Sequence, residues 1–106
     1  MMEWVRVCTT GELLPGEYQV AWDGDTPIAV INLDGELYAI EDVCTHDGGE
    51  LTGGVIEGRQ IECPRHGARF DIMTGAVLRP PATVPIATFP VRVEDGVVYT
   101  RDDRGD

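Results

Sequence analysis

The sequence predicts an all-β fold: an antiparallel β-sandwich or barrel scaffold that carries a loop-rich subdomain. Three observations support this class. The apolar residues show no helical periodicity over any long stretch. The 13 glycines and 7 prolines separate short apolar runs, as between strands. Two Asp-Gly pairs are flanked by such runs, which indicates hairpins because these residues tolerate the positive φ of a tight turn.

The strands expected in the first part of the chain follow from its short apolar runs. A turn at Asp23-Gly24-Asp25 separates the second run from the third, and Asp34-Gly35 joins the third to the fourth in a hairpin. A single helical turn fits between the first two runs, before Pro15-Gly16, and is too short to change the fold class. The expected strands, in order, are residues 3–8, 17–22, 28–33 and 36–40.

The second part of the chain is divided between loops and a final hairpin. Residues 43–81 contain seven glycines with only short apolar pieces between them, so we expect a loop-rich subdomain inserted into the β scaffold. Residues 87–94 and 97–101 are expected to pair through a turn at Asp95-Gly96. Residues 102–106 are expected to be frayed.

Length and composition fit one globular domain over residues 1–106. With 42% apolar and 25% charged residues the chain should bury a core, which argues against a disordered acidic protein. No apolar run approaches the ~20 residues of a membrane span, and no signal peptide is recognisable, so a cytoplasmic protein is expected. The net charge of −11 argues against nucleic acid and favours a partner with a basic docking patch.

Both histidines and two of the three cysteines lie within 23 residues. They form Cys44-Thr-His46 and, 16 residues later, Cys63-Pro-Arg-His66. Each pair is followed by glycine, so each is expected to be a tight loop that turns both side chains toward one point. A lone Cys is more often a small core residue, but four such residues in two matched loops predict a metal site.

Two thiolates and two imidazoles suit tetrahedral zinc as well as iron. Zinc fingers usually pair Cys with Cys and His with His, whereas each loop here supplies one of each. This interleaving favours a two-iron cluster in which one iron takes both cysteines and the other takes both histidines. A zinc-stapled β domain used for protein contacts stays an alternative.

The two motifs resemble those of the Rieske [2Fe–2S] proteins, and the likeness extends along nearly all 106 residues. The stretches 34–40, 70–75 and 80–82 are similar to the soluble Rieske-type ferredoxins that serve bacterial ring-hydroxylating dioxygenases. The resemblance implies one [2Fe–2S] cluster, with its buried iron held by Cys44 and Cys63 and its outer iron by His46 and His66. It also implies that the Pro80-Pro81 segment is a third loop that covers the cluster.

The sequence departs from the respiratory and photosynthetic Rieske proteins at four positions. Their extra loop cysteines correspond to Gly49 and Arg65, so a loop disulfide is not expected. Their Ser and Tyr hydroxyl donors correspond to Ala68 and Phe70. Because donors to sulfur stabilise the reduced state, their absence predicts a potential in the low part of the Rieske range.

The function that this resemblance implies is a one-electron carrier without its own catalytic site. It would pass electrons from an NAD(P)H-dependent flavin reductase to a terminal non-haem iron oxygenase, in transient electrostatic contacts and as a monomer, with no nucleic acid or membrane partner. The alternatives are a small Rieske subunit of a nitrite reductase complex and a ferredoxin associated with iron–sulfur cluster assembly.

Five further residues attract attention without pointing to a site. Cys8 has no partner cysteine and is expected to pack in the core of the first strand. The aromatic residues at strand positions are expected to be scaffold core rather than an electron path; they are Trp4, Tyr18, Trp22 and Tyr38.

Overall fold

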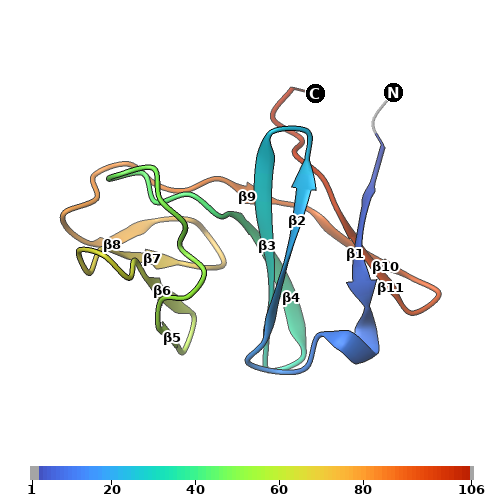
Figure 1. Ribbon diagram of the computed structural model, residues 1–106. Helices are drawn as coiled ribbons and strands as arrows, with labels where there is room; N and C mark the ends of the chain where they lie inside the picture. Colours follow the sequence, from blue (N-terminus) through green and yellow to red (C-terminus); the bar gives the residue numbers. More distant parts are fainter. Residues whose placement is uncertain (1–2, 106) are drawn as a thin grey trace.

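The computed structural model describes residues 3–105 and contains three antiparallel sheets (Figure 1), which confirms the all-β prediction. The sheets have the orders β1-β11-β10, β2-β3-β4-β9 and β5-β6-β7-β8. Within the described residues, no helix is long and apolar enough to cross a membrane. The strands are β1 (Val5–Thr9), β2 (Tyr18–Asp23), β3 (Thr26–Leu33), β4 (Glu36–Glu41), β5 (Ile56–Glu57), β6 (Gln60–Glu62), β7 (Arg69–Asp71), β8 (Val77–Arg79), β9 (Thr88–Phe89), β10 (Val91–Glu94) and β11 (Val97–Thr100).

The expected hairpins and the short helical turn are present. Asp34 and Asp95 have φ values of 53° and 51°, as the tight turns after β3 and β10 require. The helical turn is a 3-10 helix, η1 (Thr10–Glu12), and its start is satisfied by the Glu12 carboxylate, which accepts from the Thr9 N–H and hydroxyl.

The strand predicted over residues 87–94 is wrong as a single element. Thr88–Phe89 pairs with β4, whereas Val91–Glu94 pairs with β11 in another sheet. Pro90 separates the two because it has no N–H to donate to a ladder. Its carbonyl accepts a hydrogen bond from Thr100 Oγ1 at 2.8 Å. The chain therefore crosses from the middle sheet to the terminal sheet at this proline.

The β2-β3-β4-β9 sheet is the central layer of the molecule, with the other two sheets on either side (Figure 1). Alternate residues of β3 enter two different cores: Ala29 and Ile31 pack toward the loop-rich subdomain, and Ile28 and Val30 toward β1 and β11. Strand β3 is therefore apolar without a break over residues 28–31. Cys8 lies in the second core, 4% exposed, as expected.

The residues between 43 and 81 contain the small sheet β5 to β8 as well as loops. This sheet packs on the central layer through a core that includes Phe70, Ile61 and Ile72, all fully buried. Figure 1 shows that the loops of this part lie at one end of the molecule, away from β1, β10 and β11. The small sheet is therefore the platform that carries these loops.

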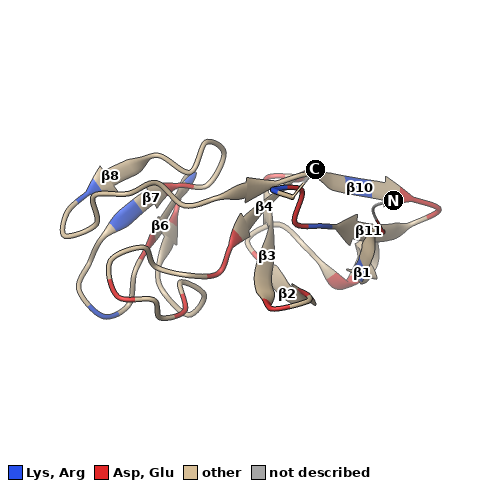
Figure 2. Cartoon of the chain, turned by 90° about the horizontal axis from the view of Figure 1, so that it is seen from above, with Lys and Arg blue, Asp and Glu red and all other residues tan. Residues whose placement is uncertain are grey.

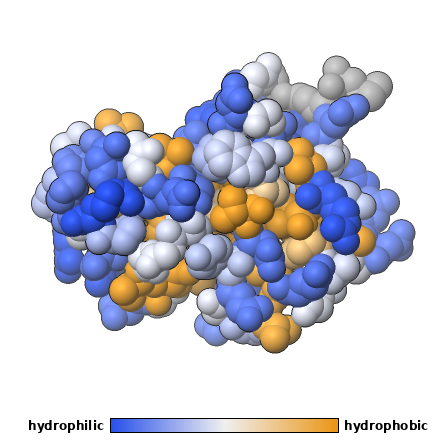
Figure 3. Space-filling model, in the orientation of Figure 1, coloured by the Kyte–Doolittle hydropathy of each residue, from blue (hydrophilic) through white to orange (hydrophobic). Residues whose placement is uncertain are grey.

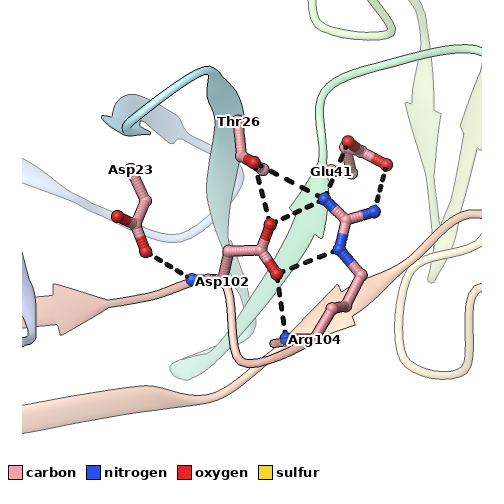
Figure 4. A network of polar contacts seen from close by, with 5 residues as sticks. All are labelled: Asp23, Thr26, Glu41, Asp102 and Arg104. Carbon is pink, nitrogen blue, oxygen red and sulfur yellow. Dashed lines mark hydrogen bonds and ion pairs between the residues drawn. The ribbon is translucent and has the colours of Figure 1, made fainter. Parts of the chain in front are cut away.

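The expectation of a frayed tail is wrong for the described residues 102–105. Asp102 accepts from Thr26 Oγ1 at 2.8 Å, and its N–H donates to Asp23 Oδ2 at 2.8 Å. Arg104 pairs with Asp102 at 2.7 Å and with Glu41 at 3.2 Å (Figure 4). These contacts hold the tail on the central sheet, next to the end of β4 from which the first cysteine loop departs.

Candidate metal centre

The two Cys/His loops have the same backbone conformation. In the first, the Cys44 N–H donates to the Gly49 carbonyl and the Gly48 N–H donates to the Cys44 carbonyl, both at 2.7 Å. In the second, residues 63–68 repeat this pattern at 2.7 and 3.1 Å. Gly48 and Gly67 each have a φ of 77°, which favours glycine. The matched sequence motifs thus fold into matched turns.

The fold brings all four predicted ligand residues together at the end of the molecule. Cys44 and Cys63 are buried, and their sulfur atoms lie within 4.8 Å of each other. His46 and His66 are exposed, and their ring centroids are 5.1 Å apart with the rings nearly perpendicular. Two thiol side chains therefore lie inside the protein and two imidazoles lie at the surface.

Burial raises the pKa of the Cys44 thiol, partly offset by the backbone N–H of His46. The neutral thiol is thus favoured while no cation is present to stabilise the thiolate. Binding of a metal at this site would displace the proton, because the thiolate is the ligating form.

An ion pair joins the two loops directly beside the ligand residues. Arg65 donates to both carboxylate oxygens of Asp47, from Nε at 2.6 Å and from Nη2 at 3.1 Å. These bonds, with one from the Gly49 N–H, hold the pKa of Asp47 well below its usual range. Arg65 Nη2 also lies 3.3 Å from Cys63 Sγ, so a fixed positive charge and an N–H donor face a predicted ligand sulfur.

The positions that were expected to lack a disulfide are adjacent in space. A Cβ on Gly49 would lie 2.4 Å from Arg65 Cζ, so a larger residue here would require the guanidinium to shift from its present position. Ala68 and Phe70 are fully buried and bring no hydroxyl group to the loops. In this chain an ion pair therefore joins the two loops at the place where a disulfide was considered and not expected.

The segment after β8 lies against the first loop. Thr45 Oγ1 donates to the Val84 carbonyl at 2.5 Å, and the Ile86 N–H donates to the Gly75 carbonyl at 2.9 Å. The Pro80-Pro81 bond in this segment is cis. The Val84 carbonyl, three residues after the cis bond, therefore joins this segment to the first loop, and its role as a cover of the cluster stays a prediction.

Asp42 is an important residue of the site that sequence reasoning missed. Its side chain is 3% exposed and accepts three hydrogen bonds: from the Leu51 N–H at 2.8 Å, the Thr52 N–H at 2.8 Å and the Thr52 hydroxyl at 2.6 Å. It closes the base of the first loop, two residues before Cys44. An acid at the end of an apolar strand, just before a ligand motif, is the signal that could have identified it.

The expectation that the strand aromatics are core is wrong for two of them. Trp22 is 61% exposed and Tyr18 is 39% exposed. Both lie on the same face of β2, which is an edge strand of the central sheet. Trp4 is partly buried, with the guanidinium of Arg101 5.1 Å from its ring centroid. Tyr38 is partly buried and packs against the core below the loops.

The scaffold is all-β, and two loops each present one Cys and one His. These features are typical of small proteins that bind a metal centre through Cys and His. Comparison with known proteins then identifies the family. Residues 3–90 match the Rieske [2Fe-2S] domain, and the chain belongs to this family.

Similar proteins cover almost the whole chain. It is 38% identical over 102 residues to the ferredoxin CarAc of Metapseudomonas resinovorans, which covers 95% of each chain. It is 35% identical over 94 residues to the ferredoxin component of a naphthalene 1,2-dioxygenase system of Pseudomonas putida, which covers 89% of this chain and 90% of that one. Among solved structures, the ferredoxin of Sphingomonas yanoikuyae B1 is 39% identical with a TM-score of 0.85, covering 94% and 99% of the two chains.

A second solved structure contains a ferredoxin together with its oxygenase. It is a complex of reduced oxygenase and oxidised ferredoxin in carbazole 1,9a-dioxygenase, matched with a TM-score of 0.87, 38% identity and 92% of each chain. The small subunit of a nitrite reductase from Mycobacterium tuberculosis is 24% identical and shares the fold.

Proposed function

We propose that this chain is a one-electron carrier, a Rieske-type ferredoxin that passes electrons from an NAD(P)H-dependent flavin reductase to a terminal non-haem iron oxygenase. The observation that carries the proposal is the pair of matched loops, which present two buried thiols and two exposed imidazoles to one region. Relatives named as ferredoxin components of naphthalene and biphenyl dioxygenases support an oxygenase as the partner.

The residues present fit a [2Fe–2S] cluster of the Rieske type. Cys44 and Cys63 would hold the buried iron, and His46 and His66 the outer iron. Such a cluster supplies reversible one-electron redox chemistry. The nearby protein groups set its surroundings: Arg65 places a donor near Cys63 Sγ, and the apolar side chains of Ala68 and Phe70 keep hydroxyl groups away.

The exposed imidazoles give the carrier its contact point with other proteins. Because both rings are exposed, a partner can approach them directly. We infer a carrier rather than a catalyst, since the four ligand side chains are all assigned to the cluster. We also propose a cytoplasmic location, a reducing compartment in which Cys44 and Cys63 stay available as ligands and do not form a disulfide.

Cluster analysis of the purified protein tests this proposal. Iron and acid-labile sulfide near two of each per chain, with a red-brown colour, are expected; a colourless protein that contains zinc would overturn it. His46→Cys and His66→Cys should each change the spectrum or lose the cluster, because a thiolate adds negative charge. Cys8→Ala is the matched control, since Cys8 lies in the other core, and it should retain the spectrum.

A further inference from the structure

An open groove runs from the edge of the central sheet to the first metal loop. Its apolar walls come from Val20 and Trp22 of β2, Pro27 of β3, and Val43, and it encloses about 460 Å³. Gly48 lines its far end. Gly48 and Glu50 belong to the loop that carries His46, so the groove and this histidine share the first loop.

Strand β2 exposes an apolar stripe above this groove. Tyr18, Val20 and Trp22 alternate along the strand and so share one face, with exposed fractions of 39%, 40% and 61%. Figure 3 shows hydrophobic residues gathered near the middle of the view, where Figure 1 draws the central sheet. Single exposed apolar residues are common, but a contiguous stripe marks an interaction site. Trp is also among the residues that most often dominate the energy of an interface.

The charge around the groove has one sign. Asp25, in the turn after β2, and Glu50, in the first loop, are exposed and lie at its edge. Its lining, as far as the structure describes it, contains no Arg or Lys. Figure 2 shows acidic residues at the β2 turn and along the loop that leaves β4. A partner with cationic groups around an apolar side chain complements this surface.

The histidine tip alone is too small to be a complete docking site. A specific interface usually buries about 800 Å² on each partner, and transient redox contacts lie at the low end of this range. Two imidazole edges cannot supply such an area. The groove offers additional apolar surface, and its lining comes from both the first loop and the central sheet.

We propose that this groove anchors the electron acceptor, an oxygenase that inserts an apolar side chain flanked by Lys or Arg beside Trp22. The inference rests on the proposed function and extends it. The groove and the two histidines then form one continuous contact surface. Trp22 provides affinity, whereas Asp25 and Glu50 steer the approach.

The test uses the cluster-loaded protein and, as the probe, the terminal oxygenase of the carbazole 1,9a-dioxygenase system, which forms a complex with a similar ferredoxin. Calorimetric titration at low salt should show that Trp22→Ala weakens binding at least about tenfold. The visible spectrum and thermal midpoint of the Trp22→Ala variant should match those of the wild type, because Trp22 is exposed. Val93→Ala is the control: Val93 is 51% exposed on β10 of another sheet, and its variant should bind as the wild type does.

A second pair of variants tests the charges. Asp25→Asn combined with Glu50→Gln should slow association and reduce its salt dependence, since steering between exposed charges is screened by salt. Asp95→Asn removes one charge in the β10–β11 turn, and it should have a smaller effect on association than Asp25→Asn or Glu50→Gln made singly.

Three outcomes would overturn the proposal: Trp22→Ala binds as tightly as the wild type, the cluster-loaded wild type does not bind this oxygenase, or sedimentation shows that the groove joins two copies of the chain. Failure of the proposed function has a different signature, namely a chain without iron and sulfide. If the cluster-loaded chain is reversibly reduced but Trp22→Ala does not change its binding to the oxygenase, only the docking site is refuted.

Discussion

Replacement of Asp42 by alanine should strongly destabilise the protein. Asp42 is buried and accepts three hydrogen bonds at the base of the first metal loop. Alanine leaves the N–H groups of Leu51 and Thr52 without this acceptor, at a cost of about 1–3 kcal/mol for each buried donor. For these two donors the expected loss is therefore roughly 2–6 kcal/mol, a large fraction of the 5–15 kcal/mol typical of a domain.

Thermal unfolding of the cluster-loaded protein measures this loss, followed by far-ultraviolet circular dichroism at one fixed heating rate. Since about 1 kcal/mol lowers the midpoint by roughly 4–8 °C in a domain of this size, Asp42→Ala should lower it by more than about 8 °C. Asp42→Asn keeps one oxygen acceptor for both N–H groups, so its midpoint should lie between those of the wild type and Asp42→Ala.

Glu50→Ala is the matched control for Asp42→Ala, because Glu50 is an exposed acid in the same loop. Its midpoint should remain close to that of the wild type, as for most surface substitutions. The reasoning is refuted if Asp42→Ala unfolds at the temperature of Glu50→Ala, or if Asp42→Asn is less stable than Asp42→Ala. Either result would mean that these three hydrogen bonds do not hold the loop.

Three other predictions concern the ion pairs and a close backbone contact. Arg65→Gln should lower the midpoint potential in voltammetry, because it removes a positive charge and weakens the donor facing Cys63 Sγ; an unchanged or higher potential contradicts this. Asp102 has a pKa far below its usual range because of Arg104, so its stabilising effect is present above about pH 4 and is lost as the pH falls further. The difference in thermal midpoint between wild type and Asp102→Asn should therefore shrink from pH 6 to pH 3, and a constant difference argues against the pairing. Gly75→Ala should destabilise more than Gly16→Ala: both have a positive φ, but only at Gly75 would the new Cβ lie 2.1 Å from the Ile86 carbonyl oxygen, and equal thermal midpoints would refute the role of that contact.

Much of the fold and of the candidate centre could be predicted from local patterns. The turns at Asp34-Gly35 and Asp95-Gly96 depend on the φ preferences of adjacent residues, so the sequence is sufficient to place them. The four predicted ligand residues were recognisable because the two loops repeat one short motif. The conformations of these turns and short loops depend on residues only a few positions apart, so the sequence shows them directly.

The sequence alone therefore determined the all-β class, the hairpins and the Cys/His loops. Only the tertiary structure decided which faces are covered: β3 is buried between two cores, whereas Trp22 on the neighbouring edge strand is exposed. It also decided the partners of Asp42 and Arg65 and the contact of Asp102 with Thr26, 76 positions away. The physical reason is that alternation along a strand distinguishes its two faces, but burial and long-range ion pairs depend on which layer packs against each face.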